Sequence, residues 1–98
     1  NESLLVNVPG RALVLDFSSV IYIDSSGEES LEELLELYQE KGIPILVYGL
    51  RQQPRDLLLR TRWLPRLGGQ HVFSDMESLR RYLEKLDKRG IEKNAGAG

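Results

Sequence analysis

The sequence predicts an α/β fold, with a central, mostly parallel sheet and helices that flank it. Two observations support this fold class. Short apolar runs alternate with amphipathic helical patterns, in the order strand, helix, strand, helix, strand, helix. The apolar runs are nearly continuous, as in strands that are buried on both faces. Strands joined through helices are expected to run parallel, with right-handed crossovers.

The first strand is predicted at residues 12–17, because this apolar run follows Pro9-Gly10 and is too short for a helix. Ser18-Ser19 indicates a turn, and residues 20–23 allow a short extended segment. A helix is predicted beyond Gly27, since its apolar positions repeat with helical spacing between glutamates. It is expected to end at Lys41-Gly42, a cation followed by glycine.

The next strand is predicted at residues 43–48, with Pro44 near its start because proline lacks an amide donor. Residues 49–53 read as a polar turn, and Pro54 as part of the first turn of a helix that reaches about Arg62. Residues 71–73 predict a minimal strand.

A capping box, Ser74-x-x-Glu77, predicts the start of the last helix. Its expected apolar face is Met76, Leu79, Leu83 and Leu86. Residues 1–90 are interpreted as one domain and residues 91–98 as a disordered tail. The first eight residues remain open between an edge strand and the end of a helix.

Composition excludes several classes of protein. The 98 residues are enough for one domain, and the absence of cysteine excludes disulfides and thiolate metal sites. No apolar stretch approaches the roughly 18 residues of a membrane span, and no signal peptide is recognised. A single histidine, His71, excludes a catalytic triad or a multi-histidine metal site within one chain, and this residue is expected to flank a strand. We therefore expect no enzyme activity, cofactor or metal, and the net charge of −2 argues against nucleic acid as a partner.

Charge is unevenly distributed, which predicts two surfaces of opposite sign. One segment holds six glutamates and no base: Glu28, Glu29, Glu32, Glu33, Glu36 and Glu40. Another holds five arginines against one aspartate: Arg51, Arg55, Arg60, Arg62 and Arg66. The arginines are candidates for contact with an anion, an anionic lipid or an acidic partner, or they are simply solvated. Trp63 is either a core residue or an exposed anchor for a partner.

The stretch D-S-S-G at residues 24–27 lies where a parallel sheet places its ligands, after a strand and before a helix. The free amides of that helix would tolerate a phosphate on Ser25 or Ser26. These residue types also cap helices, and Ser26 with Glu29 forms a capping box of its own. Both interpretations remain open, and Glu28 and Glu29 would repel a phosphate dianion.

Three stretches together resemble the STAS domain: V-L-D-F-S-S-V-I-Y-I-D-S-S-G, G-I-P-I-L-V-Y-G-L and P-R-D-L-L-L-R-T-R-W-L-P-R-L-G. This family contains anti-sigma-factor antagonists and the cytoplasmic C-terminal domains of SulP-type anion transporters. The segment L-P-R-L-G-G-Q-H-V-F-S-D-M-E-S-L is similar to the transporter branch. The resemblance therefore implies a non-catalytic regulatory and interaction domain on the cytoplasmic side of an inner-membrane transporter.

The resemblance also implies roles for the D-S-S-G loop. Ser25 is the expected phosphoacceptor, followed by Ser26, while Asp24 would order the loop and Gly27 would permit close approach. Glu28 departs from the antagonist pattern, which has an apolar residue there for docking on a kinase. The alternative remains a stand-alone anti-sigma-factor antagonist whose partner is an anti-sigma factor kinase.

The family usually has two further strands and a helix before the strand at 12–17, so the sheet is interpreted as N-terminally incomplete. An open sheet edge recruits a further strand. The expected partners are therefore the membrane domain of the same transporter or a second copy, as a homodimer or by strand exchange.

Overall fold

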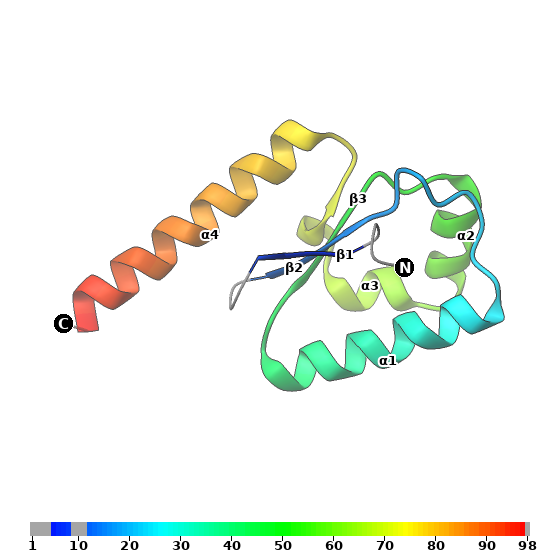
Figure 1. The fold of residues 1–98 in the computed structure, drawn as a ribbon, viewed down its shortest axis with the longest axis horizontal. Coiled ribbons are helices and arrows are strands. Elements are labelled where there is room, and N and C mark those ends of the chain that lie inside the picture. Colours follow the sequence, from blue (N-terminus) through cyan, green and yellow to red (C-terminus); the bar gives the residue numbers. More distant parts are fainter. Residues whose placement is uncertain (1–4, 9–11, 98) are drawn as a thin grey trace.

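The computed structural model describes the backbone of residues 5–8 and 12–97 and the side chains of residues 12–87. It contains a four-stranded sheet in the order β1-β2-β3-β4 (Figure 1). Strand β1 (Leu5–Val8) runs antiparallel to β2 (Ala12–Asp16), whereas β2, β3 (Ile45–Tyr48) and β4 (Val72–Phe73) are parallel. The predicted α/β fold with a mostly parallel sheet is confirmed.

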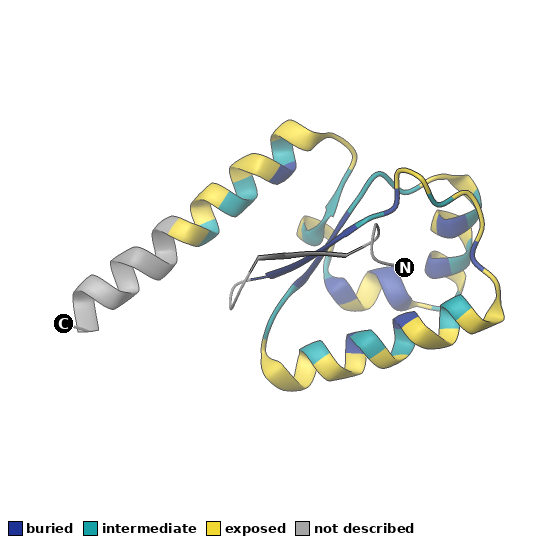
Figure 2. Ribbon diagram, in the orientation of Figure 1, coloured by how far each residue is buried: buried dark blue, intermediate teal, exposed yellow. Residues whose placement is uncertain are grey.

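Helices cover both faces of the sheet (Figure 1). One face carries α1 (Ser25–Lys41), α2 (Gln52–Arg60) and α3 (Trp63–Leu67), and their buried side chains form one core with Leu13 and Leu15 of β2. The other face carries α4 (Met76–Ala97), which places Leu79 against Ala12, Val14 and Leu46. Buried side chains therefore line both faces of the central strands. Most residues of β2 and β3 are coloured as buried in Figure 2.

Most predicted elements are present at their expected places. Strand β2 ends one residue before the predicted boundary, and β3 begins directly after Pro44. Helix α1 ends as predicted, because Gly42 adopts φ +70° and its amide donates to the carbonyls of Gln39 and Tyr38. None of the helices in the described part of the chain is long and apolar enough to cross a membrane.

Some predicted boundaries are wrong. Residues 20–23, where a short extended segment was allowed, do not join the sheet, and the backbone of Ile23 bonds to a side chain of α2 instead. Helix α2 begins at Gln52 and ends at Arg60. Arg62 then takes a left-handed conformation with φ +69°, so the chain changes direction and a separate helix, α3, follows.

The start of α4 also differs from the prediction. Asp75, not Ser74, caps the helix, since its carboxylate accepts bonds from the amide and the hydroxyl of Ser78. Met76 is 53% exposed, and the face toward the sheet is formed by Leu79, Tyr82 and residues further along. The α4 backbone continues through Gly90 to Ala97, over the segment interpreted as a tail. A glycine inside a helix costs only about 1 kcal/mol and does not oblige it to end.

The edge strands of the sheet are β1 and β4. Residues 5–8 form an edge strand, one of the two alternatives for the N-terminal segment, and they pair with β2 from Leu5 opposite Leu15 to Val8 opposite Ala12. The flank of β2 that the sequence suggested to be open is therefore covered. The outer edges belong to the four-residue β1 and the two-residue β4. Strand exchange at these edges stays a prediction.

Candidate functional site

The candidate site lies where β2 and β3 end at the carboxyl edge of the sheet. The chain leaves β2 into the loop of residues 17–24 and leaves β3 into the turn of residues 49–51. The amide of Phe17 donates to the carbonyl of Tyr48 at 2.8 Å, and the amide of Gly49 donates to the carbonyl of Phe73 at 3.2 Å. These bonds hold the two connections side by side at one edge, where open parallel sheets place their ligands.

Asp24 begins helix α1 by capping it. Its carboxylate accepts the amide of Gly27 at 2.9 Å, and its carbonyl accepts the amide of Glu28 at 2.9 Å. The predicted ordering role of Asp24 thus has a physical basis. The predicted capping box of Ser26 and Glu29 does not form, because Asp24 already satisfies this end of the helix.

Ser25 and Ser26 are the first two residues of α1, and both are exposed. Gly27 faces inward instead. A Cβ atom at this position would lie 3.1 Å from Cγ2 of Ile23, so glycine permits a close approach between the helix and the preceding loop. The half-buried Glu28 lies in the same first turn.

The loop of residues 17–24 is held by several bonds. Ser18 donates its amide and its hydroxyl to the carboxylate of Asp16, at 2.9 and 2.6 Å. The side-chain amide of Gln53 accepts the backbone N–H of Ile23 at 2.8 Å and donates to the carbonyl of Ile23 at 3.2 Å. Phe17 and Ile23 are buried at either end of the loop. The role of Gln53 could not be predicted from the sequence, because a glutamine in a polar turn gives no sign of a partner thirty residues away.

Ile21 and Tyr22 project from this fixed loop. They are 69% and 67% exposed, the highest values among the large apolar side chains described. Ile21 borders a shallow hollow of about 530 Å³, whose other walls are Arg51, Gln52, Gln53, Asp56 and Arg60. An apolar protrusion therefore lies beside a polar hollow with two guanidinium groups.

The structure brings together only some of the arginines that were predicted to contact an anion or a partner. Arg51 and Arg60 border the hollow, and Arg51 also donates to the carbonyl of Ser18 at 3.3 Å. Arg55 is exposed on α2 and donates to the carbonyl of Leu50 at 3.4 Å. Arg62 lies at the exposed turn before α3.

Trp63 cannot contact a partner, because it is only 1% exposed. Its indole N–H donates to the carbonyl of Leu31 at 2.8 Å, which joins α3 to α1. Of the two roles that the sequence left open, the structure gives Trp63 the core role. The contact role proposed for it is wrong.

An ion pair also joins α1 to α3. Arg66 donates through both terminal nitrogens to the two carboxylate oxygens of Glu32, each at 2.6 Å. These hydrogen bonds hold the pKa of Glu32 below its usual value and raise the pKa of Arg66. One member of the acidic segment and one of the basic segment are thus paired within the chain.

The Glu32–Arg66 pair should make stability depend on pH. We expect Glu32→Gln to lower the free energy of unfolding at pH 7 by about 0.5–1 kcal/mol, a modest value because both side chains are more than one third exposed. The native pKa of Glu32 is lowered from 4.5, so the contribution of the pair is present above that value and is lost as the pH falls through the native pKa. Urea denaturation of both proteins at pH 7 and near pH 3 checks this. A difference that persists unchanged at the lower pH would contradict it.

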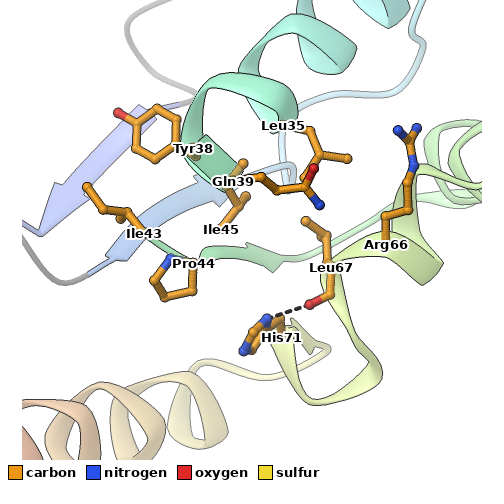
Figure 3. A pocket seen from close by; sticks show the side chains of 9 residues that line it. All are labelled: Leu35, Tyr38, Gln39, Ile43, Pro44, Ile45, Arg66, Leu67 and His71. Carbon is orange, nitrogen blue, oxygen red and sulfur yellow. Dashed lines mark hydrogen bonds between the residues drawn. The ribbon is translucent and has the colours of Figure 1, made fainter. Parts of the chain in front are cut away.

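His71 lies at the opposite end of the sheet, in the 3₁₀ turn η2 (Gly69–His71), and flanks β4 as expected. Its Nδ1 lies 2.6 Å from the carbonyl of Leu67 and its Nε2 lies 3.1 Å from the hydroxyl of Tyr82. Because a carbonyl only accepts, a neutral His71 carries its proton on Nδ1 and accepts from Tyr82. The ring borders a small pocket of about 90 Å³ before β3 (Figure 3). Both ring nitrogens are engaged, which favours a structural role.

Within residues 12–87, no three histidine, aspartate or glutamate side chains come together as metal ligands would. The carboxyl-edge loop contains hydroxyl groups and one capping carboxylate, and His71 lies at the other end of the strands.

Comparison with known proteins identifies the family of this chain. A family model described as the STAS domain matches residues 2–79. The chain is also 29% identical over 80 residues to the putative sulfate transporter YvdB of Bacillus subtilis (strain 168). The match covers 80% of this chain but 15% of that relative, so the chain spans a small part of the relative's length. The search of solved structures gave no significant match.

Proposed function

This chain belongs to the STAS domain family, and we propose that it serves as a non-catalytic regulatory and interaction domain of a bacterial SulP-type anion transporter. The similarity to a putative sulfate transporter over 80% of the chain supports this proposal. The proposed partner is the membrane domain of the same transporter, and the proposed location is its cytoplasmic side.

The exposed pair Ile21 and Tyr22 carries the proposal. A loop that exposes two large apolar side chains is a typical protein contact, because covering them removes apolar surface from water. The Gln53 and Asp24 bonds fix both ends of this loop, so little conformational entropy is lost when a partner binds. Arg51 and Arg60 beside Ile21 would add contacts to acidic groups on the partner.

Ser25 is the proposed point of regulation. It is exposed at the first position of α1, two residues after Ile23, and its phosphate would face the amino end of that helix. Phosphorylation would add about −1.5 to −2 charge next to the contact loop. Ser26, the next residue and also exposed, is the second candidate acceptor.

The test measures binding of this domain to the purified membrane domain of its transporter in detergent or nanodiscs. We expect Ile21→Ser with Tyr22→Ser to weaken binding by about tenfold or more, the usual effect of removing a contact hot spot. The matched control is Met76→Ser, since Met76 is 53% exposed but lies on α4 at the other face of the sheet. It should leave the affinity unchanged, and Ser25→Glu should weaken binding if the loop is regulated by charge.

Circular dichroism establishes that each variant is folded. Equal affinity of the wild type and the double variant would overturn the proposed contact. Equal losses for the double variant and for Met76→Ser would also overturn it, because binding would then not depend on the loop.

A stand-alone anti-sigma-factor antagonist is the second candidate, favoured by the exposure of Ser25 at the start of α1. It would bind an anti-sigma factor kinase and release it once Ser25 is phosphorylated. The binding measurement itself distinguishes the two functions, because an antagonist binds a kinase and shows no affinity for a membrane domain.

A further inference from the structure

We propose that two copies of this chain associate through complementary charged surfaces on the helices of one face, an acidic surface on α1 and a basic surface on α2 and the turn after it. These surfaces lie on the outer sides of the helices and do not include Ile21 or Tyr22, although Arg60 also borders the hollow beside Ile21.

The acidic surface consists of Glu29, Glu33, Glu36 and Glu40 around Leu37. These five positions share one side of α1, because they follow helical spacing, and all are exposed. Leu37 is 45% exposed in their midst. Within residues 12–87, none of these four carboxylates forms an ion pair.

The basic surface consists of Arg55, Arg60 and Arg62 around Leu59, which is 50% exposed. Asp56 is the acidic member of this stretch, so the surface keeps a positive sign. None of these three arginines forms an ion pair with the described side chains; Arg55 reaches only a backbone carbonyl.

The two surfaces show the same order of residues along the sequence, with opposite sign. Glu33 and Glu40 stand four residues before and three residues after Leu37. Arg55 and Arg62 stand at the same sequence offsets from Leu59, but Arg62 lies beyond the end of α2, in the turn where it takes φ +69°. Each surface therefore has an exposed leucine flanked along the chain by two like charges, and one surface could cover the other with apolar contact at the centre and opposite charges around it.

Opposite charges already pair within the chain on the inner side of α1. Glu32 points toward α3 and pairs with Arg66, and the charge of Glu36 also acts on Arg66, which leaves Glu29, Glu33 and Glu40 for a contact beyond the chain. A second copy fits because it supplies both surfaces at once. Helices α1 and α2 cover the same face of the sheet (Figure 1), so a two-fold axis can place each acidic surface on the basic surface of the other copy.

Sedimentation velocity over about 10 µM to 1 mM protein tests the association, since exposed charges and two leucines predict a weak contact. We expect self-association near 0.05 M salt that falls as the salt is raised to about 0.5 M, because salt screens exposed charges. Glu33→Lys with Glu40→Lys should abolish it, and so should Arg55→Glu with Arg62→Glu. Mixing these two charge-reversed variants should restore a dimer.

The matched control is Arg81→Glu with Lys85→Glu on α4, which changes the net charge as the arginine pair on the basic surface does. It should self-associate like the wild type and should not form a dimer with the glutamate-reversed variant. A wild type that stays monomeric over the whole range at low salt would overturn the proposal. Restoration by the α4 control would overturn it too, because net charge alone would then explain the pairing. Ile21→Ser with Tyr22→Ser should leave self-association unchanged, which separates this result from the loop contact.

Discussion

Replacing Trp63 by alanine is expected to lower the free energy of unfolding by about 3–5 kcal/mol. Trp63 is 1% exposed and is among the largest fully buried side chains. Its removal leaves a cavity among residues of α1, α2 and β2, and it also removes the bond to the carbonyl of Leu31. A small domain has about 5–15 kcal/mol of total stability, so this variant should be close to unfolding at 37 °C.

Urea denaturation followed by circular dichroism measures the effect. Trp63→Phe separates packing from the hydrogen bond, because phenylalanine fills much of the space but cannot donate to Leu31. We expect Trp63→Phe to lower the free energy of unfolding by about 1–2 kcal/mol. Leu59→Ala, at an exposed position of α2, should change stability by less than about 0.5 kcal/mol. If Trp63→Ala were as mild as Leu59→Ala, the assignment of Trp63 to the core would be wrong.

Replacing Gly49 by alanine is expected to lower the free energy of unfolding by about 2–3 kcal/mol. Gly49 has φ +74°, and an added Cβ would lie 3.0 Å from the Cβ of Ser18 and 3.2 Å from its Cα and amide nitrogen. Backbone atoms of Ser18 cannot move aside without shifting the loop that carries Ile21 and Tyr22. The variant should therefore also raise hydrogen exchange at the amides of residues 18–23.

Gly42→Ala is the matched control for this effect. Gly42 has a similar φ of +70°, but an added Cβ would meet nothing within 4 Å. Gly42→Ala should lower the free energy of unfolding by only about 1 kcal/mol, the conformational penalty of alanine at positive φ. It should leave hydrogen exchange in the loop unchanged. Equal losses of stability in the two alanine variants would show that the close contact with Ser18 does not affect the free energy of unfolding.

The order of the elements could be predicted from the sequence because it depends on local features. Apolar runs identified β2, β3 and β4, and the helical spacing with Gly42 identified α1 and its end. The break between α2 and α3 was missed, since Arg62 is not a residue type that usually takes positive φ. The cap at Asp75 was missed because two neighbouring residues both have capping side chains.

The sequence predicted the position of the D-S-S-G loop in the fold but not the structural roles of its residues. The D-S-S-G stretch lies at the carboxyl edge of the sheet, as predicted. That Asp24 caps the helix while Ser25 is exposed could be seen only once the first residue of α1 was known. The proposed contact residues Ile21 and Tyr22 lie in a run for which the sequence allowed a short extended segment, with no sign that they are exposed. Their exposure follows from Gln53, whose bonds to Ile23 turn the loop away from the sheet.

The sequence by itself determined the fold class, the order of strands and helices, the resemblance to the STAS family and the place of the candidate loop, because periodicity, glycine and proline positions act over a few residues. The tertiary structure decided which side chains are exposed and which are paired. Trp63 bonds to Leu31, Glu32 pairs with Arg66, and the bonds of Ile23 to Gln53 hold the loop that exposes Ile21. Each of these contacts joins residues thirty or more positions apart, so its partners depend on how the helices pack on the sheet.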